Sequence, residues 1–313
     1  MRTSLLFFIQ VLFSIAALVI ALYILDLSYL LENLKLISVV SVLGALALNL
    51  VSIYLMSWRW FWIEQGIKFS GSSESIFTYF TASIYNLISP GNLGGDVYRF
   101  VALKSKSLTT LVLTGKIFRE RLVGLGSICL AAFLALLFTP TESFFYPRFY
   151  NLFLILTFLL SIAVLTLFFS PSSFFNLINS KNLKESFLNF LSPIHGFKEN
   201  LVILGISIFA YLIWILSISF IAASLGVDIP FYSLVLVGSL VELIRFIPIS
   251  VQGIGIREGA FAFFLTSYNL DMETSYLIGL ISYTLLSLSL LMVGLTGLLA
   301  LILRKKTPLD SLE

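Results

Sequence analysis

The sequence has few charged residues, a single cysteine and a single histidine. Only 11% of its 313 residues are charged and 59% are apolar, whereas an average soluble domain has about 25% charged residues. Because Cys129 and His195 each stand alone, a disulfide framework is excluded and a zinc site lacks its usual ligands. We therefore expect no metal and no cofactor, and we interpret His195 as an ordinary surface residue rather than a member of a catalytic triad.

The apolar residues are concentrated in long runs, which a soluble core could not bury. Residues 5–24 approach the length of about 20 residues that spans a bilayer, and this run is too long for a signal peptide. Five further runs have a similar character: residues 36–57, 122–139, 150–170, 201–225 and 275–303. The sequence therefore predicts an all-α polytopic membrane protein with about six full transmembrane helices.

Two other apolar regions, residues 74–103 and 232–268, are interrupted in the middle. The first contains NLISPGNLGGDVYRF and the second ELIRFIPISVQGIGIREGAF. A proline inside a helix costs about 3 kcal/mol and a glycine about 1 kcal/mol, so such clusters mark real breaks. Irregular backbone at membrane depth requires protein or water around it, and we interpret each region as a re-entrant helical hairpin. The break residues are Pro90, Gly91, Gly94 and Gly95 in the first hairpin and Pro248, Gly253 and Gly255 in the second.

The distribution of basic residues predicts the orientation. With a cytoplasmic N-terminus, 14 of the 19 lysines and arginines fall on cytoplasmic segments, and only Lys35 and Arg148 fall outside. Each half of the chain then crosses the membrane three times, so the second half is inverted relative to the first. We expect one domain, 1–313, made of half-repeats at about 1–140 and 150–303, in the inner (cytoplasmic) membrane with both termini cytoplasmic. Fully spanning hairpins would also leave both termini cytoplasmic.

Two polar segments remain outside the spans. Residues 171–200 predict a short amphipathic helix in the cytoplasmic interface, and a structured loop over the bundle is the alternative. Residues 304–313 form a cytoplasmic tail.

Charges beside the breaks require an explanation, since an ionised group at the bilayer centre costs about 2.5 to 3.5 kcal/mol. Asp96 and Arg99 are three residues apart, as are Glu242 and Arg245, so each pair can meet on one helix face. These pairs either take part in function or only stabilise the hairpins.

Arg257 and Glu258 are adjacent, so we expect them to point in different directions and to need other partners. They open a helix after Gly253 and Gly255. Free N–H groups at a helix start, together with an arginine, favour an anion such as a phosphate.

The segment KIFRERLVG places Arg119, Glu120 and Arg121 at the predicted cytoplasmic mouth of the 122–139 helix. They either bind lipid phosphates or enforce topology. Arg59, between two tryptophans at the end of the 36–57 helix, is expected to be an interfacial anchor with no further role.

The ordered set RW, SPGNLGGDVYRF, RERLVGL and IPISVQGIGIREGAF resembles the lysylphosphatidylglycerol synthase transmembrane (flippase-like) family over nearly the whole chain. The resemblance implies a lipid-handling membrane module, since its members flip aminoacylated phosphatidylglycerol or are linked to polyprenyl-phosphate sugar pathways. Synthase members also carry a soluble aminoacyl-transferase domain, so we do not expect lipid synthesis from this chain alone. The family's motif positions correspond here to Pro90, Gly94, Gly95, Asp96, Arg99, Glu120, Arg121, Pro248, Gly253, Gly255, Arg257 and Glu258.

We therefore predict a translocase that moves an anionic, modified or polyprenyl-phosphate-linked lipid between leaflets. Arg99 and Arg257 would hold phosphate, and Asp96 and Glu258 would position them or a cationic part of the headgroup. The predicted headgroup-binding residues are Asp96, Arg99, Glu120, Arg121, Glu242, Arg245, Arg257 and Glu258.

Two alternatives remain. One is a membrane-embedded transferase or phosphatase acting on a lipid phosphate, with Asp96 or Glu258 as base. The other is an accessory subunit of a lipid-modifying synthase. The expected partners are membrane lipids and a separate lipid-modifying enzyme, and a homo-oligomer is left open. No nucleic-acid role is expected, because the net charge of +3 follows from the membrane asymmetry.

Overall fold

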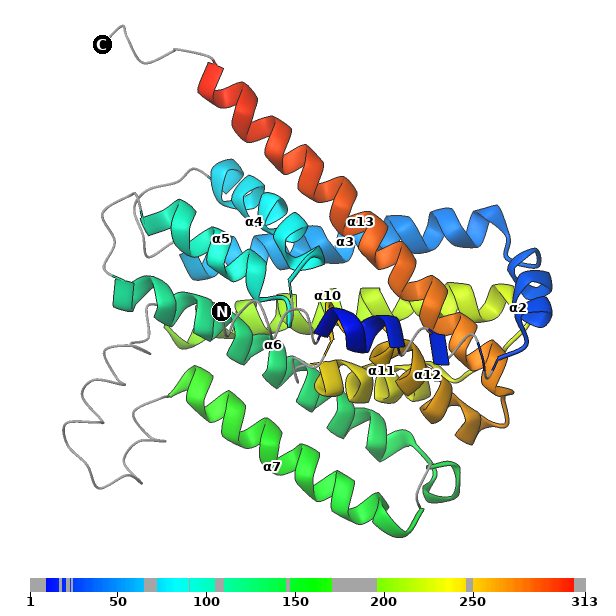
Figure 1. Cartoon of the computed structure of the whole chain (residues 1–313). Coiled ribbons are helices and arrows are strands. Elements are labelled where there is room, and N and C mark those ends of the chain that lie inside the picture. Colours follow the sequence, from blue (N-terminus) through cyan, green and yellow to red (C-terminus); the bar gives the residue numbers. More distant parts are fainter. Residues whose placement is uncertain are drawn as a thin grey trace, which may run out of the picture.

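The chain folds into a helical bundle in the computed structural model (Figure 1). The structure describes residues 10–16, 19–20, 23, 25–64, 72–89, 91–104, 110–144, 147–170, 196–245 and 250–306. Within these ranges the regular structure is helical and no β-strand occurs. The protein is therefore an all-α polytopic membrane protein, as predicted.

Five helices are long and apolar enough to span a membrane, and they confirm five of the predicted spans. Half of the predicted first span, 5–24, lies outside the described residues, and residues 10–16 of the span are helical. The five spanning helices are α3 (Val39–Glu64), α6 (Thr110–Phe138), α7 (Tyr150–Phe169), α10 (Phe197–Ser224) and α13 (Met272–Lys306).

Helix α6 begins at Thr110, earlier than the expected start at residue 122. Its additional turns carry Lys116, Arg119 and Glu120, which are all buried. Because protein partners surround these charges, the helix does not have to end before them. The expectation that Arg119, Glu120 and Arg121 lie at the start of this helix was therefore wrong.

The two interrupted regions form pairs of short helices. The first pair is α4 (Ser72–Leu87) and α5 (Leu93–Lys104), and the second is α11 (Phe231–Arg245) and α12 (Ile256–Leu265). Within each pair the two helices pack against each other. Pro90 and Pro248 lie outside the described residues.

The two hairpins enter the bundle from opposite ends. Arg304 near the end of α13 donates to Ser73 at the start of α4 at 2.7 Å, while Tyr29 lies 3.2 Å from Thr274 at the start of α13. The start of α11 lies beside the end of α6, since Phe231 and Phe138 line one apolar groove. The link 227–229, which leads into α11, lines one cavity with Ser41 at the start of α3, next to α2, so the start of α11 is at the same end as the start of α13 and the start of α4 is at the other end.

The end that holds the starts of α3, α11 and α13 is acidic, and we refer to it as the acidic end (on the right in Figure 1). It also carries the short helix α2 (Leu27–Leu34) and the 3₁₀ turns η1 (Thr141–Ser143), η2 (Pro147–Phe149) and η3 (Thr266–Tyr268). In the described part of this end, Lys35 and Arg148 are outnumbered by Asp26, Glu32, Glu142, Asp228, Asp271 and Glu273.

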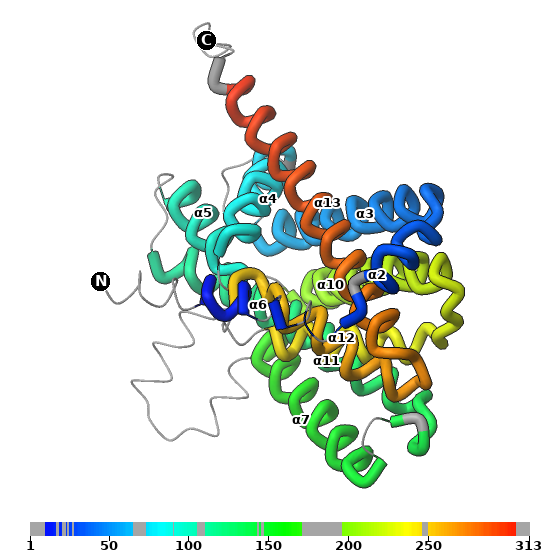
Figure 2. Tube along the Cα trace, turned by 45° about the vertical axis from the view of Figure 1, so that its right-hand side comes forward, coloured from blue at the N-terminus to red at the C-terminus, as the bar shows by residue number. Residues whose placement is uncertain are grey.

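Helix packing follows a matched pattern in the two halves of the chain. Helix α3 packs along α10, and α4 packs against α13 as α11 packs against α6. Helix α5 contacts α6, and α12 contacts α13 in the same way. Helix α7 packs mainly against α6 and lies at the edge of the bundle (Figure 2).

Two predicted segments lie mostly outside the described residues. Most of the predicted interfacial segment 171–200, including His195, lies outside the described residues, and α10 already begins at Phe197. The tail beyond Lys306 is also outside them.

Candidate functional site

A buried charge network, the first network, joins α3, α5 and α6. Glu120 is at its centre: it accepts a hydrogen bond from Arg59 at 3.0 Å and forms an ion pair with Arg99. Arg99 also pairs with Asp96, which in turn binds Nε of Arg121 at 2.5 Å. The contact between Asp96 and Arg99, predicted from their spacing, is confirmed. With three arginines and two carboxylates, this network carries one excess positive charge.

Aromatic rings and a hydroxyl complete the surroundings of the two buried arginines. The guanidinium carbon of Arg99 lies 4.2 Å from the centre of the Trp60 ring and 5.2 Å from that of Tyr79. Arg59 donates to the Ser207 hydroxyl of α10 at 3.0 Å. The ring faces stabilise a cation that is shielded from water. Arg59 and Trp60 therefore belong to the network, and the expectation that they act only as interfacial anchors was wrong.

The second network is built from α11, α12 and α13. Arg245 pairs with Glu242 at 2.5 Å, as the spacing predicted, and the Tyr283 hydroxyl donates to the same carboxylate at 3.0 Å. Arg257 lies over the ring of Tyr283, 4.3 Å from its centre. It also pairs with Glu258 at 2.9 Å. This network is neutral.

The expectation that Arg257 and Glu258 point apart was wrong. The long arginine side chain bends back so that its Nε reaches one carboxylate oxygen, while the other oxygen accepts the backbone N–H of Gly255 at 2.7 Å. Arg257 also donates to the backbone oxygen of Gln252 at 3.3 Å. Both side chains are thus occupied in holding the second break together.

The glycines of the breaks are required by close approach or by left-handed backbone. A side chain on Gly94 would meet the backbone oxygen of Tyr85 at 2.3 Å, so only glycine lets α5 fold back on α4. In the second break Gly253 and Gly255 have φ of +81° and +84°. Gly95 packs against Asn86 in the same hairpin, since its N–H donates to the Asn86 amide oxygen at 2.8 Å.

The two breaks meet at a small pocket of about 40 Å³, lined by Gly91, Asn92, Arg121, Arg245 and Gln252. Asn92 and Gln252 hold left-handed backbone, with φ of +55° and +52°. Such conformations are uncommon for residues with side chains and occur often at functional sites. The pocket therefore combines strained backbone from both halves with one arginine from each half.

Arg121 and Arg245 are the accessible arginines of the two networks. Their side chains are 31% and 21% exposed, against 6% for Arg99 and 5% for Arg257. Arg121 donates hydrogen bonds from Nε to the Asp96 carboxylate and from Nη2 to the backbone oxygen of Asn92. Arg245 donates from Nη2 to the Glu242 carboxylate. Among the described residues, Nη1 of both arginines and Nε of Arg245 have no hydrogen-bond partner, so these N–H groups remain for an anion.

The eight predicted headgroup-binding residues thus separate into two groups. Arg121 and Arg245 line the pocket, and Asp96 and Glu242 hold them directly. The other four, Arg99, Glu120, Arg257 and Glu258, are buried behind them.

Two residues of these surroundings were not predicted from the sequence. Tyr283 contacts both Glu242 and Arg257. The ammonium of Lys116 donates to the backbone oxygens of Ile63 and Glu64. No local pattern marks either residue, because their partners are distant in sequence. Within the described part of the chain, no three His, Cys, Asp or Glu residues are placed to hold a metal ion.

The chain matches one protein family over most of its length. The family model described as the lysylphosphatidylglycerol synthase TM region matches residues 7–294. No curated protein matches the chain in sequence.

Proposed function

Because the chain belongs to the lysylphosphatidylglycerol synthase transmembrane family, a lipid-related membrane module, we propose that it is a lipid translocase. Its substrate is an anionic, modified or polyprenyl-phosphate-linked lipid that moves between leaflets. The headgroup passes the pocket between the two breaks while the acyl chains stay in the bilayer. The observation that carries the proposal is the pair of arginines, one from each half, that line this pocket.

An inverted repeat gives such a protein a way to alternate its access. The hairpins enter from opposite ends, and the packing of α4 on α13 mirrors that of α11 on α6. Many secondary transporters consist of inverted halves with broken helices, and their substrates bind where the breaks meet. Rocking of one half against the other would then open the pocket to each leaflet in turn.

Arg121 and Arg245 bind the lipid phosphate in this mechanism. Arginine suits phosphate because its planar fork of N–H donors forms paired, charge-assisted hydrogen bonds. The phosphate binds the N–H groups of Arg121 and Arg245 that Asp96, Asn92 and Glu242 leave free, and its negative charge offsets the excess positive charge of the first network. Arg99 and Arg257 position the hairpin helices from behind, which revises the roles first expected for them.

The outer face of α5 suits the acyl chains. Val97 and Val101 are 61% and 63% exposed, and Leu93, one helical turn earlier, is 50% exposed. Asp96 and Arg99, which belong to the same helix, join the first network. Helix α5 therefore presents hydrocarbon to lipid along one face and charge to the protein interior along the other.

We also propose the inner membrane and cytoplasmic termini for this protein. The acidic end would then face outward, in agreement with the tendency of basic residues to stay in the cytoplasm.

The proposal is tested in proteoliposomes that contain phosphatidylglycerol labelled with a fluorophore on its headgroup or chain. Dithionite quenches label in the outer leaflet, so the rate of further quenching reports translocation. We expect wild-type protein to accelerate quenching, and Arg121→Gln and Arg245→Gln to lower the rate about tenfold or more, since a hydrogen bond to a charged group is worth about 1.5 to 3 kcal/mol.

Arg148→Gln is the matched control, because Arg148 lies in η2 at the acidic end, away from the pocket. It should translocate at the wild-type rate. Equal rates in all four proteins would refute the proposed site, and conversion of the lipid into a new product would favour an enzyme instead.

A further inference from the structure

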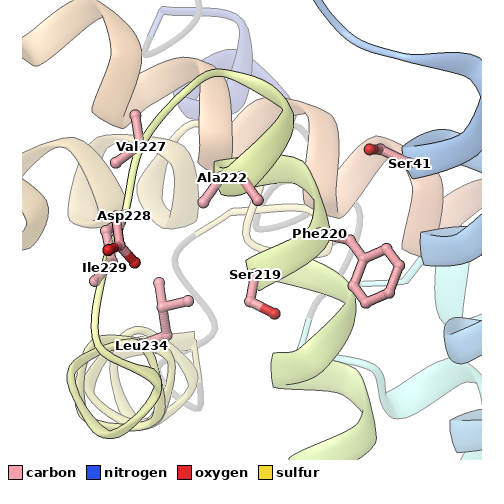
Figure 3. Close-up of a pocket in the computed structure, with 9 residues that line it drawn as sticks. Ser41, Ser219, Phe220, Ala222, Val227, Asp228, Ile229 and Leu234 are labelled. Carbon is pink, nitrogen blue, oxygen red and sulfur yellow. The ribbon is translucent and has the colours of Figure 1, made fainter.

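A second, larger cavity of about 430 Å³ opens at the acidic end of the bundle (Figure 3). It is separate from the pocket between the breaks, and no residue lines both. Its walls come from the start of α3, the last turns of α10, the link 227–229 and α11. The residues that decide its chemistry are Ser41, Ser219, Phe220, Asp228, Ile229 and Leu234.

The electrostatics of this cavity favour a cation. Asp228 is the charged residue among those that line it, it is exposed, and its carboxylate has no hydrogen bond or ion pair among the described residues. Helix α10 ends beside it, where the Val227 N–H donates to the Ala222 oxygen at 3.1 Å. The carboxyl end of a helix carries about half a negative charge. The starts of α3 and α11, which also border the cavity, carry the opposite partial charge, so the negative charge of the cavity comes mainly from Asp228 and from the surrounding acidic end.

The walls favour an organic cation over a metal ion. One carboxylate and two hydroxyls are too few for calcium, which takes about six to eight oxygen ligands. Phe220, Ile229 and Leu234 provide apolar surface beside the polar groups. A cavity of this size falls in the usual range for small-molecule sites, about 300 to 1,000 Å³. In Figure 3, Asp228 on the link and Ser219 on α10 lie on opposite sides of the space.

We propose that this cavity binds the ammonium group of a zwitterionic phospholipid such as phosphatidylethanolamine. Asp228 pairs with the ammonium, and the Ser219 hydroxyl on the opposite side of the cavity faces the rest of the headgroup. The lipid's hydrocarbon lies along Phe220, which is exposed. The site lies at an end of the spanning helices, which is the depth at which headgroups occur. It is independent of the translocation pocket, so either can fail without the other.

The test uses the purified full-length chain in detergent, with lipid binding followed by native mass spectrometry. Short-chain phosphatidylethanolamine is titrated in parallel with phosphatidylglycerol of the same chain length and with free ethanolamine. We expect the wild type to prefer phosphatidylethanolamine. Asp228→Asn should weaken that binding about fivefold, the upper worth of an exposed ion pair, and should leave phosphatidylglycerol unaffected.

Glu142→Gln is the matched control, because Glu142 is another exposed carboxylate of the acidic end and does not line the cavity. It should bind like the wild type. The proposal is overturned if Asp228→Asn binds phosphatidylethanolamine as tightly as the wild type, if both variants lose affinity equally, or if free ethanolamine binds as tightly as the lipid. Unchanged thermal unfolding of Asp228→Asn, expected because its carboxylate has no partner, shows that a loss is local.

Discussion

Replacing Glu120 by glutamine should destabilise the protein more than any exposed change of the same kind. Glu120 is 4% exposed and holds two arginines at once. After the change Arg99 still has Asp96, but Arg59 keeps only the Ser207 hydroxyl among its described partners. The variant therefore leaves one buried cation without a counter-charge.

The size of the effect follows from the burial of this pair. Removing one partner of a buried ion pair costs about 3 to 5 kcal/mol, because the remaining charge stays shielded from water. The glutamine oxygen can still accept one hydrogen bond, so we expect a loss near the lower limit, about 3 kcal/mol. The double variant Arg59→Met with Glu120→Gln removes the stranded cation. It should therefore lose at least about 1 kcal/mol less than the sum of the two single variants.

The measurement is reversible unfolding in mixed micelles with increasing dodecyl sulfate, followed by tryptophan fluorescence. Glu142→Gln, an exposed carboxylate change, should stay within about 0.5 kcal/mol of the wild type. A loss below about 1 kcal/mol for Glu120→Gln, or full additivity in the double variant, would refute the claim that Glu120 organises the first network.

Two further changes test close packing and the second network. Gly297→Ala should cost about 1 to 3 kcal/mol in the same unfolding assay, because the new Cβ would lie 2.7 Å from the backbone nitrogen of Thr81 on α4. Gly205→Ala is the control: its new Cβ would have nothing within 4 Å, so this variant should be as stable as the wild type or more stable. An equal loss of stability in both variants would contradict this reasoning. Tyr283→Phe keeps the ring over Arg257 but removes the 3.0 Å hydrogen bond to Glu242, so we expect a loss of about 1.5 to 3 kcal/mol. Wild-type stability of Tyr283→Phe would show that Glu242 does not depend on that bond.

The spanning helices could be predicted because their signal is contained in each segment alone. A run of about 20 apolar residues has few other stable uses, and five predicted runs coincide with helices of the structure. Segment composition could not give the start of α6, because Lys116 and Glu120 make its first turns look like a polar loop. The groups that bind them, a backbone oxygen for Lys116 and Arg99 for Glu120, are on other helices.

The candidate site was predictable only where contacts are local. The pairs Asp96 with Arg99 and Glu242 with Arg245 follow from helical spacing. Arg59 is 61 residues from Glu120, and no spacing rule links them.

The short hairpin helices have an electrical consequence. Helices α4, α5, α11 and α12 contain 16, 12, 15 and 10 residues, so each is about 15 to 24 Å long, less than the roughly 30 Å of membrane hydrocarbon. If water fills the space beside each hairpin as far as its break, the transmembrane voltage falls across the short distance between the two breaks, where Arg121 and Arg245 lie. A headgroup of charge −1 that crosses this distance would gain or lose about 2.3 kcal/mol per 100 mV. Membrane voltage alone could then set the direction of its movement.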